Sequence, residues 1–89
     1  MSQDRTRSWY EVGKEQGIRA GRLGGEVQRN ARDFADEDDN TAWIDGVLEG
    51  VMSEGARIAA ITSVQDLMPG SKGGFIQVIV VERRSVARS

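Results

Sequence analysis

Two stretches in the C-terminal half decide the fold: Arg57-Ile-Ala-Ala-Ile-Thr-Ser-Val64 and Phe75-Ile-Gln-Val-Ile-Val-Val-Glu-Arg83. Both are rich in β-branched residues, and their pattern has the period of two that is typical of strands. The segment between them, 65–74, contains Met68-Pro69-Gly70 and Ser71-Lys72-Gly73-Gly74, which are turn sequences. The sequence therefore predicts an antiparallel hairpin closed by a mobile loop over 65–74.

The second of these strands is apolar on both faces, because Ile76, Val78 and Val80 alternate with Phe75, Ile79 and Val81. One layer of helices covers only one face of a hairpin, and a two-stranded ribbon alone is barely stable in water. We therefore expect oligomerisation to complete the sheet by extension or by stacking, with Ile79 and Val81 in the interface.

Two amphipathic helices are predicted upstream of the hairpin. The segment 41–54 has apolar residues over one half of a helical wheel, good N-cap residues before it and Gly55 at the position that ends a helix. A longer amphipathic pattern covers 10–35. The fold class that follows is α+β, with two helices followed by an antiparallel hairpin.

Small residues form a seam along the predicted 10–35 helix. They follow one another at alternating spacings of three and four, as in a heptad repeat, and predict close approach of another backbone. The alternative is that Gly24-Gly25 breaks the helix in two. Together with Ile79 and Val81, the predicted oligomer interface contains Gly13, Gly17, Ala20, Gly24, Val27 and Ala31.

The length of 89 residues predicts a single domain over 1–89, with 1–8 and 85–89 frayed. A domain of this size buries only about 60% of its unfolded surface, and the absence of Cys and His removes disulfides and the common metal ligands. Self-association is the remaining source of burial. The N-terminus has no apolar signal segment and no run approaches a membrane span, so we expect a cytoplasmic protein without a membrane partner.

The charge is divided into blocks. Residues 1–32 carry seven basic and four acidic groups (+3), residues 33–55 carry eight acidic groups (−8), and residues 56–89 carry five basic and two acidic groups (+3). Solvated faces explain such blocks, and so do contacts with charged partners. In one hypothesis the protein is an oligomeric sequestering or adaptor module. Arg22, Arg29 and Lys72 then bind an anionic small ligand such as a nucleotide, since the two arginines are seven residues apart on one helical face.

A second hypothesis assigns the −8 segment to a basic protein partner. The segment then imitates a row of phosphates, as in small phage-borne inhibitors of bacterial defence systems. Its candidate contact residues are Asp36, Asp38, Asp39, Asp45 and Glu49. A third hypothesis is a purely structural assembly protein. Direct nucleic-acid binding is not favoured, because acidic groups dilute the basic ones and only five aromatic residues are available for stacking.

Catalysis is not expected from this composition. Without His or Cys the common nucleophile and base pairs are absent, and so are zinc sites. Asp45 and Glu49 lie one helical turn apart, where a solvated stripe is the simpler interpretation. The run 36–39 lacks the spacing of a calcium loop. We therefore expect no enzyme activity, no cofactor and no metal.

Seven positions in the passage 48–81 follow a recognisable pattern: Leu48, Val51, Glu54, Gly55, Ile58, Gly73 and Gly74. Through these positions the passage resembles a family of small uncharacterised bacterial and phage domains. Ala56 stands where the family has tryptophan, and the N-terminal half is predicted as helix where the family begins with a strand. The resemblance implies a helix followed by a closing hairpin and implies no chemistry.

Overall fold

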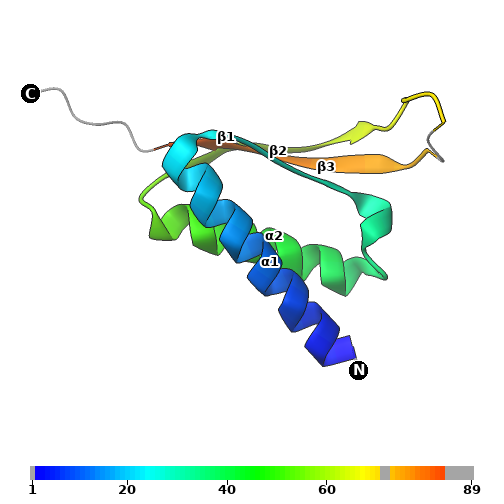
Figure 1. The fold of residues 1–89 in the computed structure, drawn as a ribbon, viewed down its shortest axis with the longest axis horizontal. Coiled ribbons are helices and arrows are strands. Elements are labelled where there is room, and N and C mark those ends of the chain that lie inside the picture. The colour runs from blue at the N-terminus through cyan, green and yellow to red at the C-terminus, as the bar shows by residue number, and fades with distance from the viewer. Residues whose placement is uncertain (1, 71–72, 84–89) are drawn as a thin grey trace, which may run out of the picture.

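The computed structural model describes the backbone of residues 2–70 and 73–83, and the side chains of residues 8–70 and 73–83. In chain order the elements are α1 (Ser2–Leu23), β1 (Gly25–Asn30), the 3-10 turn η1 (Ala31–Asp33), α2 (Glu37–Ser53), β2 (Arg57–Gln65) and β3 (Phe75–Glu82). The strands form one antiparallel sheet in the order β1-β3-β2. Both helices lie on the same side of this sheet (Figure 1), so the α+β class is confirmed.

The prediction of a continuous helix over 10–35 is wrong. α1 begins at Ser2 and ends at Leu23, and Gly24 and Gly25 follow with φ of 77° and 111°. Glycine adopts these angles without the steric cost that other residues meet, and the Gly24 N–H donates to the Ala20 carbonyl to close the last turn. The next residues become β1, which pairs with β3. The chain therefore supplies a third strand to its own sheet.

Glycines bring the two helices into backbone contact. A Cβ atom built on Gly13 or Gly17 overlaps the carbonyl oxygen of Trp43 or Val47 on α2. From the other side, a Cβ atom on Gly46 or Gly50 overlaps carbonyl oxygens of α1. The close helix partner that the seam predicted is thus α2 of the same chain, which corrects the placement of Gly13 and Gly17 between subunits.

The core lies between this helix pair and one face of the sheet. Ile79 and Val81 of β3 and Val27 of β1 are buried there against Trp43, Val47 and Val51 of α2, with Ala20 of α1 in the same cluster. Ile79 and Val81 therefore bury their side chains within one chain, which also corrects their assignment to an oligomer interface. Ala31, the last residue of the predicted interface, lies half-buried in η1.

Three aromatic residues hold the N-terminal part of α1 to the start of α2. Trp9 packs edge-on against Phe34, with ring centroids 4.8 Å apart, and Phe34 lies 5.8 Å from Trp43. The Trp43 indole N–H donates to Gln16 Oε1 over 2.7 Å, which satisfies the buried donor.

Neither helix of the described residues combines the length and the hydropathy that a membrane-spanning segment needs.

Candidate association edge

The outer strand β2 is the most exposed regular element of the sheet. It is nine residues long, and within 2–70 and 73–83 it pairs only with β3, so one row of its backbone N–H and C=O groups has no partner strand there. Eight of its residues are exposed and Ile58 is half-buried. Ile61 faces the helices and Val64 faces the opposite side, yet both residues are 46% exposed. No described element covers this edge.

The sequence of β2 lacks most features that protect an edge strand. Natural edges are usually short, or carry charges or proline that prevent pairing with another chain. Residues 58–65 contain no charge and no proline, although a β-bulge interrupts the register between Ile58 and Ala60. Beyond this bulge, Ala60 to Gln65 pair regularly with β3. The strand therefore offers an uninterrupted pairing surface over this stretch.

The far end of the hairpin is fixed to the rest of the sheet. Asn30 and Arg32 both contact the Asp66 carboxylate, at 3.4 and 3.6 Å, and Arg32 donates to the Gly73 carbonyl over 2.8 Å. The Asp66 N–H donates to the Gly74 carbonyl. The hairpin tip extends past both helices (Figure 1), which leaves Phe75 55% exposed on the helix side of the sheet.

The opposite edge, β1, differs in length and composition. It has six residues, among them Glu26 and Arg29. The Gln28 amide donates to the Glu26 carboxylate over 2.8 Å, and the Arg29 guanidinium lies 3.5 Å from Asp33. Charged side chains of this kind disfavour pairing with another strand. β1 is therefore the better protected of the two edges.

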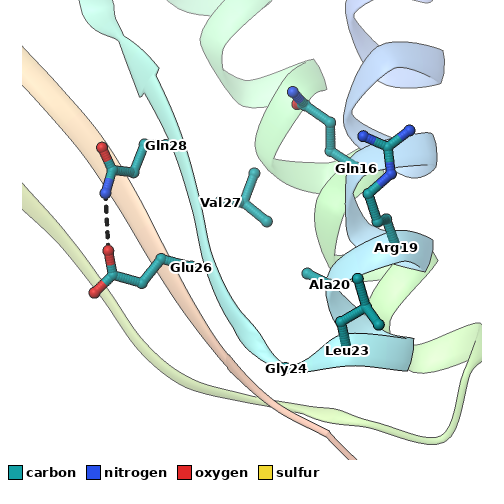
Figure 2. Close-up of a pocket in the computed structure, with 8 residues that line it drawn as sticks. All are labelled: Gln16, Arg19, Ala20, Leu23, Gly24, Glu26, Val27 and Gln28. Atoms are coloured by element: carbon teal, nitrogen blue, oxygen red, sulfur yellow. Dashed lines mark hydrogen bonds between the residues drawn. The ribbon is translucent and has the colours of Figure 1, made fainter.

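A cleft of about 260 Å³ lies between α1 and β1 (Figure 2). Its floor contains Ala20 and Val27, both buried, and the Val27 side chain points towards α1. Glu26 and Gln28 line the cleft through their strand, but Figure 2 shows their side chains on its far side. Arg19 and Gln16 of α1 supply the polar side chains, and the side-chain oxygen of Gln16 already accepts a hydrogen bond from the Trp43 indole N–H.

The structure does not bring the predicted ligand-binding arginines together. Arg22, near the end of α1, pairs with Glu54 at 3.2 Å. Arg29 lies on β1, with its guanidinium 5.0 Å from the centre of the Trp9 ring. The helical face that would have held both arginines does not exist, because the helix ends between them. Lys72 lies outside the described residues.

Two of the predicted acidic contact residues organise the start of α2. The Asp36 carboxylate caps the helix by accepting from the Asp39 N–H over 3.1 Å. Asp39 is fully buried, and its carboxylate accepts from the Ala35 N–H over 3.2 Å. Asp38, Asp45 and Glu49 are exposed. Among the described residues, no three His, Cys, Asp or Glu side chains gather as a metal site.

Sequence reasoning missed two features of these surfaces. The first is the contact of Gly46 and Gly50 with α1. The signal was present, since Gly46 and Gly50 have the same four-residue spacing as Gly13 and Gly17. Which strand of the hairpin forms an edge was not predictable before β1 was known to occupy the other side of β3.

Comparison with family models, with curated proteins and with solved structures finds no match to this chain. The resemblance over 48–81 therefore stays a prediction. Functional inference depends on the chain's own surfaces.

Proposed function

We propose that this chain is a non-enzymatic, self-associating binding module. The observation that carries the proposal is β2, a nine-residue edge strand that is uncharged from 58 to 65 and exposed on both faces. Pairing with another strand satisfies its outward backbone groups and removes Ile61 and Val64 from water. Burial of such side chains stabilises by about 25 cal/mol per Å² of apolar surface.

Domain size supports the same proposal. The buried apolar core of the described residues consists of eleven residues, three of them alanine. A small core of this kind leaves marginal stability in the monomer, and association adds burial that the fold itself does not provide.

Sedimentation equilibrium of the purified chain tests self-association. The mass should rise from 9.8 kDa towards a multiple of that value as concentration increases. The melting temperature should rise with concentration as well, because association stabilises the folded state by mass action. A mass of 9.8 kDa at every concentration would contradict the proposal.

A second candidate function, binding of a small anion, is supported by the cleft between α1 and β1. Arg19 has an exposed side chain and no ion pair among the described residues, while Glu26 points away from the cleft. The apolar floor suits the non-polar part of a small anionic ligand.

A panel of nucleotides and carboxylates, read by thermal shift, tests this second function. A ligand of the cleft should raise the melting temperature of the wild type and of Arg22→Gln, but not of Arg19→Gln. Equal shifts in both variants, or none in the wild type, would remove the cleft as an anion site.

A further inference from the structure

Building on the proposed self-association, we propose that β2 pairs with β2 of a second copy. The two strands are antiparallel, and the two-fold axis passes between the two Thr62 residues, which lie opposite each other. Two three-stranded sheets then join into one six-stranded sheet. The strand order across it is β1-β3-β2 followed by β2-β3-β1 of the second copy. All four helices lie on the same side of this sheet.

Symmetry restricts the possible registers. Two adjacent antiparallel strands of identical chains are related by a two-fold axis perpendicular to the sheet, and such an axis keeps each face on its own side. Residues directly opposite each other share a face, and faces alternate along a strand. In a regular ladder, one residue of β2 must therefore lie opposite its own copy.

The bulge selects that residue. Regular pairing with β3 begins at Ala60, so a ladder free of the bulge uses residues from Ala60 onward. An axis at Thr62 places Ala60 opposite Val64 and Ile61 opposite Ser63, and threonine pairs across strands are favourable. An axis one residue later places Ala60 opposite Asp66, whose carboxylate is bound to Asn30. The axis at Thr62 therefore gives the better match.

Charge and side-chain size favour a second copy as the occupant. No charged residue lies between Ile58 and Gln65, so the two strands meet without like charges opposite each other. The two Arg57 residues lie far apart, one at each end of the paired strands. The exposed Val64 packs beside the small Ala60 of the second copy, on the same face as Val78 of β3.

The assembly closes at two copies. After pairing, both outer edges of the six-stranded sheet are β1, whose Glu26 and Arg29 disfavour further addition. The helices leave the joined edge accessible, because Ile61 is 46% exposed on the face that they cover elsewhere.

A charge swap at Thr62 tests the pairing. Thr62→Lys and Thr62→Glu each place like charges opposite each other across the axis and should be monomeric, whereas an equimolar mixture should form a heterodimer. Gln28→Lys is the matched control, because Gln28 and Thr62 flank Val78 in one row, both exposed, on the two opposite edges. This control should associate as the wild type does. Dissociation by Gln28→Lys would indicate stacking of sheet faces and overturn the inference.

Single-cysteine variants test the register, since the chain has no native cysteine. Directly opposite residues have Cα atoms about 4.5–5.5 Å apart, within the range of a disulfide, whereas diagonal neighbours lie about 7–8 Å apart. Thr62→Cys should therefore cross-link faster than Ile61→Cys or Ser63→Cys. Faster cross-linking at either control position overturns the axis at Thr62.

The outcomes separate this inference from the function on which it rests. If the wild type and Thr62→Lys associate equally, pairing through β2 is refuted but self-association is not. A wild type that is monomeric at every concentration refutes both.

Discussion

The pair of helices and the β2 edge are both surfaces suited to close contact with a backbone, but among the described residues only the helices have a partner. Gly13 and Gly17 meet α2, and Gly46 and Gly50 meet α1. β2 presents a row of backbone groups to which no described element is paired. The small residues therefore serve packing within the chain, whereas the outer edge of β2 has no partner among the described residues.

Substitutions in the two surfaces should therefore be detected by different measurements. Substitutions in the helix pair should change the free energy of unfolding and leave the associated mass of the folded protein unchanged. Substitutions at the outer row of β2 should change the mass and leave the stability of the monomer unchanged.

The largest effect is expected for Gly46→Ala. Its Cβ atom overlaps the Tyr10 carbonyl oxygen, and a backbone atom cannot move aside as a flexible side chain can. We expect a loss of about 2–3 kcal/mol in the free energy of unfolding, even though alanine favours the helix itself. Urea unfolding measures the change. Asp45→Ala, the exposed neighbour, should lie within about 0.5 kcal/mol of the wild type.

The next effect belongs to the open edge. Thr62→Lys should weaken self-association by at least about tenfold, or 1.4 kcal/mol, because two lysines face each other across the axis. Its melting temperature should rise less with concentration than that of the wild type, and at high dilution the two should be equal. A lower melting temperature at high dilution would show that Thr62 stabilises the monomer instead.

A smaller effect is expected at the start of α2, which positions the glycines of the helix pair. Asp36→Ala removes the carboxylate that caps the helix and should cost about 1 kcal/mol in urea unfolding. The exposed Asp38 makes no described side-chain contact, so Asp38→Ala should cost only a few tenths of a kcal/mol through the helix dipole. Equal losses would mean that the cap contributes nothing beyond charge.

The smallest effect is expected for Arg22→Gln. The ion pair between Arg22 and Glu54 joins the last turn of α1 to the end of α2, but the Arg22 side chain is 67% exposed. Pairs this exposed contribute about 0–1 kcal/mol, and salt screens them. A loss larger than that of Gly46→Ala would show that charge, not close packing, holds the helices together.

The sequence predicted the elements whose periodicity comes from their own burial. β3 begins at Phe75 as expected, and β2 extends one residue beyond the predicted Val64. α2 begins at Glu37, four residues before the predicted Thr41, because Asp36 is the N-cap. In these segments the apolar residues recur with the period of a strand or a helix clearly enough for the pattern to indicate the structure.

The sequence could not predict β1, because Val27 is its only large apolar residue. Val27 also fits the three-and-four spacing of a helical seam, so local pattern favoured the wrong element. Pairing of Val27 with Ile79 decides the conformation, and that contact lies far away along the chain. The insertion of β1 beside β3 then leaves β2 as the other edge, which makes the candidate interface a consequence of tertiary structure.

The most direct test of association through β2 is the mass of Thr62→Lys beside that of Gln28→Lys, measured by sedimentation equilibrium at the lowest concentration at which the wild type is a dimer. The two lysines flank the same Val78 on the same face, one on each edge of the sheet. We expect a 9.8 kDa monomer for Thr62→Lys and a dimer of twice that mass for Gln28→Lys. Identical masses for the two variants would contradict association through β2.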